Sequence, residues 1–118
     1  MDKTTGLTHL IKSTQYSMQG LKSAVKYETA FRHELFCCLF MIPLALWLGD
    51  DAIEKALMIG SVLLVLVVEL LNSAIEAVVD RIGTEHHELS GRAKDQGSAA
   101  VFIALVIVTI TWAFMLFN

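Results

Sequence analysis

The sequence predicts an all-α membrane protein, with an N-terminal amphipathic surface helix followed by three membrane-spanning helices. Hydrophobic residues make up 55% of the 118 residues and charged residues only 18%, and the mean hydropathy is +0.60, values typical of integral membrane proteins. Uncharged apolar stretches occupy residues 35–48, 56–68 and 97–117. The length suits one domain over residues 1–118. The net charge of −3 without a basic cluster argues against nucleic-acid binding.

Residues 6–28 are predicted to form the surface helix. Apolar residues recur at three- and four-residue spacing and share one face, whereas the lysines and glutamines lie off it. The apolar positions are Leu7, Leu10, Ile11, Met18, Leu21 and Val25. A basic amphipathic helix beside a membrane span usually lies in the interface plane. The alternative is a helix that packs on the aqueous side of the protein.

The first span is predicted at about residues 31–48. Its uncharged part, Leu35 to Leu48, is 14 residues long and reaches about 21 Å, less than the roughly 30 Å of a hydrocarbon core. The span therefore includes residues before Leu35, or the bilayer thins locally. Pro43 is a candidate kink, and Trp47 lies where an interfacial anchor is expected.

The second span, residues 52–79, carries a polar stripe in the run ELLNSAIEAVVD. At 100° per residue, Glu69, Asn72, Glu76 and Asp80 fall within an arc of about 80° on one face. An unpaired carboxylate in hydrocarbon costs several kcal/mol, so these side chains face protein, water or a cation. The stripe indicates a divalent-metal or proton-handling site. The alternative is polar contact between packed helices.

Residues 80–96 are predicted to form a polar loop, and residues 97–117 the third span. The loop has cations and hydroxyls suited to phosphate oxygens. The first 33 residues hold five Lys or Arg, residues 49–55 hold one and the 80–96 loop holds three. By the positive-inside rule, the N-terminus and the 80–96 loop are cytoplasmic and the C-terminus lies outside.

The position of the stripe favours chemistry between an aqueous and a membrane substrate. With Ala56 at the outer boundary, Glu69 lies about 20 Å and Glu76 about 30 Å into the bilayer. The chain has neither a P-loop nor the kinase catalytic-loop motifs. Phosphate chemistry here would therefore use the acidic helix and the basic loop. One carboxylate would activate a hydroxyl, others would hold Mg²⁺, and a lysine would offset charge.

Two stretches resemble the prokaryotic diacylglycerol kinase family, and the resemblance covers essentially the whole chain. They are VELLNSAIEAVVDRIGTEHHELSGRAKDQGSAA, which resembles the family signature, and TTGLTHLIKSTQYSMQGLKSAVKYETAFRHE, which resembles its surface helix. The resemblance implies a three-span homotrimeric kinase of the bacterial inner membrane. Such an enzyme transfers the γ-phosphate of ATP, with Mg²⁺ as cofactor, to diacylglycerol and produces phosphatidic acid and ADP for phospholipid recycling.

The resemblance also implies residue roles, in sites shared between neighbouring subunits. Glu69 matches the general base, Glu28 and Glu76 match the Mg²⁺ ligands, and Asn72 and Asp80 support the polar face. The ATP-contact positions are His9, Tyr16, Glu28, Glu76, Glu85, His86, His87, Lys94 and Asp95, where His9 replaces an expected arginine and His86 a frequent tyrosine. The lipid-contact positions are Ser17, Ala30, Phe31, Arg32, His33, Glu34, Trp47, Glu69, Ser98 and Trp112.

Two other functions are considered. An undecaprenol kinase would have the same fold and catalytic positions, although the TTG start and the loop sequence look closer to the diacylglycerol type. A small oligomeric proton or cation conductor would use Glu69 and Glu76 to line a pore. That function explains the acidic stripe but neither GRAKD nor the acid at Glu28.

Overall fold

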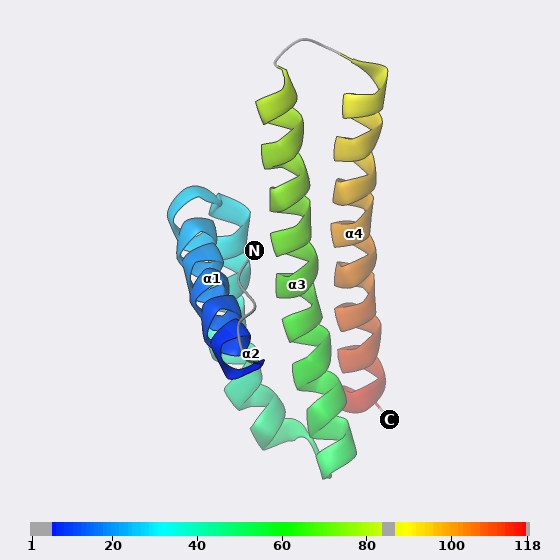
Figure 1. The fold of residues 1–118 in the computed structure, drawn as a ribbon. Coiled ribbons are helices and arrows are strands. Elements are labelled where there is room, and N and C mark those ends of the chain that lie inside the picture. Colours follow the sequence, from blue (N-terminus) through cyan, green and yellow to red (C-terminus); the bar gives the residue numbers. More distant parts are fainter. Residues whose placement is uncertain (1–5, 84–86, 118) are drawn as a thin grey trace.

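The computed structural model describes residues 6–83 and 87–117, and these residues form four helices. They are α1 (Gly6–Tyr27), α2 (Thr29–Leu48), α3 (Ala52–Ile82) and α4 (Glu88–Leu116). Helices α3 and α4 run antiparallel side by side, and the α1–α2 hairpin lies on the other side of α3 (Figure 1). The all-α prediction is confirmed.

Three of the described helices, α2, α3 and α4, are long and apolar enough to cross a membrane. The 31 residues of α3 and the 29 residues of α4 correspond to about 46 Å and 44 Å, more than the roughly 30 Å of a hydrocarbon core. One end of this pair extends beyond the α1–α2 hairpin (Figure 1). These lengths leave room for helical segments outside the apolar layer.

A small core joins α2, α3 and α4. It contains Cys38 and Ala45 from α2, Met58 and Val62 from α3, and Trp112 from α4. The indole N–H of Trp112 donates to the carbonyl oxygen of Met58 at 3.2 Å. Only 8% of Trp112 is exposed, so most of the residue is enclosed by protein, and the lipid contact implied for it stays a prediction. A buried indole N–H needs an acceptor, and the Met58 carbonyl has a lone pair beyond its helical bond.

The predicted polar loop over residues 80–96 is largely helical. Helix α3 continues to Ile82 and α4 begins at Glu88, with His87 as its N-cap. The His87 Nδ1 accepts a hydrogen bond from the Leu89 backbone N–H at 3.1 Å. The loop prediction is wrong over these residues because a helix satisfies its own backbone hydrogen bonds and can continue into water without an apolar face. The end of an apolar stretch in the sequence indicates where a helix leaves the membrane, but not where the helix itself ends.

A tight turn joins α2 to α3. Asp51 is the N-cap of α3, and its side chain accepts from the Glu54 backbone N–H at 2.8 Å. Glu54 in turn accepts from the Asp50 backbone N–H at 3.0 Å. The Asp51 side chain satisfies a donor that the first turn of α3 leaves open, and the Glu54 carboxylate ties the residue before the N-cap to the same turn.

We expect Trp112→Ala to lower the free energy of unfolding by about 2 kcal/mol, because it removes core contacts and a buried hydrogen bond. Trp47→Ala is the matched control, since Trp47 is 79% exposed, and it should change stability by less than about 0.5 kcal/mol. Unfolding in mixed micelles, followed by circular dichroism, measures both. Equal stability of the two variants would contradict the core assignment.

Candidate active site

The polar stripe lies on the face of α3 that is buried in the bundle. That face begins with Met58, Val62 and Val65 and continues through Glu69 and Ser73. Along the stripe the exposure rises: Glu69 is only 6% exposed, Asn72 and Glu76 are half-buried, and Asp80 is exposed. One helix face therefore leads from the protein interior to the solvent-exposed end of α3.

Four carboxylates gather around the buried part of this stripe. Glu28, Glu34 and Glu76 lie close enough to Glu69 for their charges to act on it. Glu34 belongs to α2, and Glu28 is the single residue between α1 and α2. Like charges repel strongly where the effective dielectric constant is low. Their mutual repulsion is therefore a feature that a ligand at this site would change.

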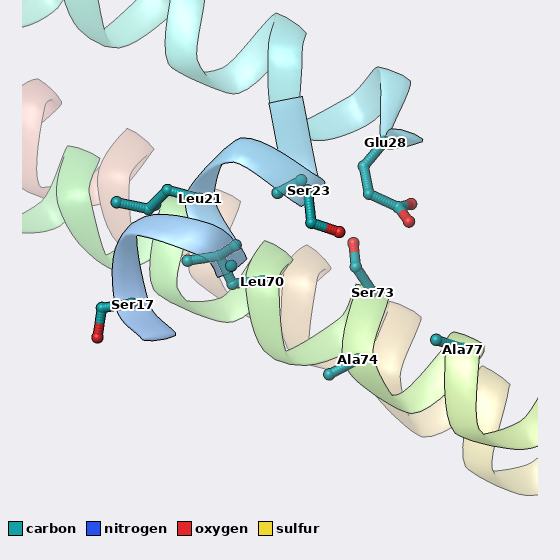
Figure 2. A pocket seen from close by; sticks show the side chains of 10 residues that line it. Ser17, Leu21, Ser23, Glu28, Leu70, Ser73, Ala74 and Ala77 are labelled. Atoms are coloured by element: carbon teal, nitrogen blue, oxygen red, sulfur yellow. The ribbon is translucent and has the colours of Figure 1, made fainter. Parts of the chain in front are cut away.

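A groove of about 520 Å³ lies beside this cluster, between α1 and α3. At one end the hydroxyls of Ser23 and Ser73 point toward each other, and the Glu28 carboxylate lies beside them (Figure 2). Leu21, Leu70, Ala74 and Ala77, with Ser17, Gly20 and Ala24, form the rest of the lining. Apolar walls with a few convergent polar groups are typical of small-molecule sites. The groove suits a ligand with a polar head and an apolar chain.

Ser23 and Ser73 were not predicted as site residues. A single hydroxyl carries no periodic signal in a sequence, and its value depends on which helices meet. Only the approach of α1 to α3 brings the two serines together.

The Glu28 carboxylate is available to a ligand. Glu28 is the N-cap of α2, yet in the part of the chain that the structure describes its side chain makes no capping hydrogen bond. N-cap side chains commonly accept from the first N–H groups of their helix. The free carboxylate instead points to the polar end of the groove (Figure 2).

The donor chemistry fits Mg²⁺. This ion prefers oxygen ligands and commonly uses one or two carboxylates together with phosphate oxygens and water. Glu28 and Glu76 supply two carboxylates near Glu69. Within residues 6–83 and 87–117, no group of three or more His, Cys, Asp or Glu side chains is placed to hold a metal ion. Two carboxylates suit an ion that arrives on a nucleotide.

Lys94 brings a cation from α4 to the exposed end of the stripe. Its Nζ lies 2.9 Å from an Asp80 carboxylate oxygen, and its charge also interacts with Glu76. Both partners of the ion pair are solvent-exposed, so the pair contributes little to stability. Its position next to Glu76 is the more informative feature.

The remaining ATP-contact candidates are scattered. His9 and Tyr16 lie on exposed parts of α1 and do not line the groove. His87 and Asp95 are exposed at the start of α4, whereas Glu85 and His86 lie outside the described residues. The structure therefore does not bring His9 or Tyr16 to the acidic cluster.

The predicted lipid contacts also divide. Ser17 lines the groove and Glu34 lies near Glu69. Ala30, His33, Trp47 and Ser98 are exposed elsewhere on the surface. Phe31 is only 1% exposed, so its side chain is enclosed by protein. The Arg32 guanidinium donates to carbonyl oxygens at the end of α1. The lipid contacts implied for these two residues stay predictions.

Asn72 depends on a close approach of α4. A Cβ atom on Gly97 would collide with the Asn72 side-chain oxygen and lie 3.3 Å from its Cγ. Within the described ranges, that oxygen is buried and has no hydrogen-bond partner. A side chain at position 97 would therefore displace the Asn72 amide or move α4 away from it.

A groove for an amphipathic ligand beside one buried and three half-buried carboxylates, in a bundle of membrane-length helices, is the arrangement expected of a small membrane enzyme that acts on a lipid. Comparison with known proteins identifies the family to which the chain belongs. The model of the family described as "Prokaryotic diacylglycerol kinase" matches residues 15–116. The chain belongs to the prokaryotic diacylglycerol kinase family, as the sequence predicted.

Relatives that align over nearly their whole length support this family assignment. Over 117 residues, the chain is 71% identical to a diacylglycerol kinase of Haemophilus influenzae, with 99% of each chain covered. It is 56% identical to a diacylglycerol kinase of Escherichia coli strain K12, with 99% of this chain and 96% of the relative covered. A Pseudomonas aeruginosa relative of the same name is 50% identical over 95% of this chain and 91% of its own. The prediction of a membrane kinase is confirmed.

We expect Gly97→Ala to lower kinase activity by about tenfold, because the new methyl group displaces the Asn72 amide or pushes α4 away. Gly60→Ala is the matched control: it also places alanine in a long helix, but a Cβ there meets nothing within 4 Å. Initial rates in mixed micelles, with folded protein verified by circular dichroism, measure both. Full activity of Gly97→Ala would show that the close approach is dispensable.

Proposed function

We propose that the chain transfers the γ-phosphate of Mg-ATP to the hydroxyl of diacylglycerol and produces phosphatidic acid and ADP, in support of phospholipid recycling. The observation that carries this proposal is the buried Glu69 carboxylate, with Glu28 nearby at the polar end of an amphipathic groove. The groove suits the lipid, and the exposed end of the stripe suits the nucleotide.

In the proposed reaction, Glu69 acts as general base. Its carboxylate takes the proton from the lipid hydroxyl while the hydroxyl oxygen forms a bond to the γ-phosphorus. The bond between the γ-phosphorus and the bridging oxygen of ADP breaks, and ADP leaves with that oxygen. Burial of Glu69 limits competition from water.

The nucleotide would bind at the exposed side of the cluster. Glu28 and Glu76 would hold Mg²⁺, which neutralises charge on the phosphates when bound. Lys94, which already interacts with Asp80 and Glu76, would offset developing charge on the transferred group. His9, Tyr16, Glu85, His86, His87 and Asp95 are proposed as further nucleotide contacts on the strength of the family resemblance.

We also propose a homotrimer whose sites are shared between subunits. His9 and Tyr16 do not line their own subunit's groove, so contacts from these residues would be made to a neighbour's site. The α3 residues Leu64, Val67, Leu71 and Val78 are exposed to between 37% and 61% and offer an apolar face for assembly.

In the membrane, α1 would lie in the cytoplasmic interface. Its apolar residues Leu7, Leu10 and Ile11 are exposed to 68%, 62% and 50%, which is expected of a helix face that contacts acyl chains. The N-terminus and the connection between α3 and α4 would be cytoplasmic, and the C-terminus would lie outside. Packing of α1 against another subunit is the alternative.

The proposed function is tested by offering purified protein diacylglycerol and undecaprenol side by side, in mixed micelles with Mg-ATP. ADP release and labelled lipid are followed together. Phosphatidic acid as the preferred product supports the proposal, and preference for undecaprenol would change the substrate but keep the mechanism. A folded protein that phosphorylates neither lipid would refute it, and ion flux in vesicles would then test the conductor.

We expect Glu69→Gln to reduce the turnover of diacylglycerol by about a thousandfold while Mg-ATP binding is retained, because the amide cannot accept the proton. Glu76→Gln should weaken Mg-ATP binding as well, since it removes a proposed metal ligand. Titration of the nucleotide without lipid separates the two effects. Turnover of Glu69→Gln at the parental rate would refute the general-base assignment.

A further inference from the structure

The guanidinium of Arg32 in α2 holds the C-terminal end of α1. Its Nη1 donates to the carbonyl oxygens of Val25 at 2.8 Å and Lys26 at 3.2 Å, and its Nη2 donates to the Thr29 hydroxyl at 3.1 Å. The last carbonyls of a helix have no intrahelical partner. A cation is favourable there because the C-terminal end carries partial negative charge. Arg32 thus caps α1 from the next helix.

This cap lies at the corner that carries Glu28. The Glu28 N–H donates to the Ala24 carbonyl at 2.9 Å, and its own carbonyl accepts from the Arg32 N–H at 3.2 Å. Glu28 adopts an extended backbone, with φ −111° and ψ 107°, so the chain changes direction at this one residue. Contacts between α1 and α2 are otherwise sparse. The direction of the Glu28 side chain therefore depends on how the two helices are tied together.

We propose that Arg32 is a positioning residue for Glu28. By capping α1 it fixes the corner so that the Glu28 carboxylate points to the polar end of the groove, where a divalent cation would bind. The inference rests on the proposed function, in which Glu28 is a metal ligand. The lipid contact that the resemblance implied for Arg32 stays a prediction, since these hydrogen bonds use three of the five N–H donors of the guanidinium.

The arginine fork is what the corner requires. Its planar donors reach two carbonyls and a hydroxyl together, whereas a lysine ammonium at this position is a single point charge on a flexible stem. Arg32→Lys should therefore keep the charge and lose part of the geometry. Arg32→Ala loses both.

Cation binding is measured without turnover. Mn²⁺ replaces Mg²⁺ as a probe visible by electron paramagnetic resonance, in the presence of a non-hydrolysable ATP analogue and without lipid. We expect the dissociation constant of Mn²⁺ to rise about tenfold in Arg32→Ala and about threefold in Arg32→Lys, as loss of hydrogen bonds to a charged donor implies. Glu28→Gln defines the signal without this ligand.

Lys26→Ala is the control for charge. Lys26 is at the same corner, and its Nζ lies 5.1 Å from the centre of the Tyr27 ring, so the substitution removes one positive charge without removing a cap. It should leave Mn²⁺ binding within about twofold of the parental value. The KM for diacylglycerol should likewise stay within about twofold in Lys26→Ala.

Several results would overturn the proposal. They are parental Mn²⁺ affinity in both Arg32 variants, an equal loss in Lys26→Ala, or a raised KM for diacylglycerol with unchanged Mn²⁺ affinity. If Arg32→Ala does not fold, the Mn²⁺ affinity of Arg32→Lys alone tests the proposal. Failure of the proposed function is separate, because it appears as absent lipid phosphorylation by the parental protein, whatever the Arg32 variants do to Mn²⁺ binding.

Discussion

The structure depends on the burial of one carboxylate, that of Glu69, in a helix apolar enough to cross a membrane. A carboxylate left unpaired in hydrocarbon costs several kcal/mol, so α3 requires neighbours that shield this position from lipid. α2 supplies one wall and brings Glu34 near. α1 folds back at Glu28 and supplies the groove wall that faces Ser73. A helix pair of α3 and α4 alone would leave the stripe facing lipid.

The same constraint explains why the site is elongated along one helix. From Glu69 to Asp80 the stripe covers about three turns of α3, and its exposure increases along the way. The apolar part of the groove lies against the buried end, whereas Lys94 meets Asp80 at the exposed end. Two substrates of opposite solubility can therefore approach one cluster from different phases without a large movement of the protein.

Helical periodicity predicts which residues share a face of a helix, but not which neighbouring helix that face contacts. This difference decides how much of the structure could be predicted. The spacing of Glu69, Asn72 and Glu76 places them on one face whatever surrounds the helix, so the stripe was predicted correctly. Residues 88–96 were not, because a polar sequence is equally compatible with a loop and with a solvated helix. The burial of Trp112 could not be read from its sequence position, since the preference of tryptophan for interfaces concerns depth, not which side of the helix faces a neighbour. The contacts of Ser23, Ser73 and Arg32 arise from tertiary packing.

The one-residue connection between α1 and α2 has a consequence for how the chain tolerates changes in length. Each added residue turns a helix by about 100° and advances it by about 1.5 Å. An insertion at Glu28 would therefore rotate the wall that α1 gives to the groove away from α3, together with the other apolar side chains of α1. The turn at residues 49–51 is far from the groove, so a change in its length would not rotate a groove wall. Insertions and deletions should accordingly be far more damaging at the α1–α2 corner than at that turn.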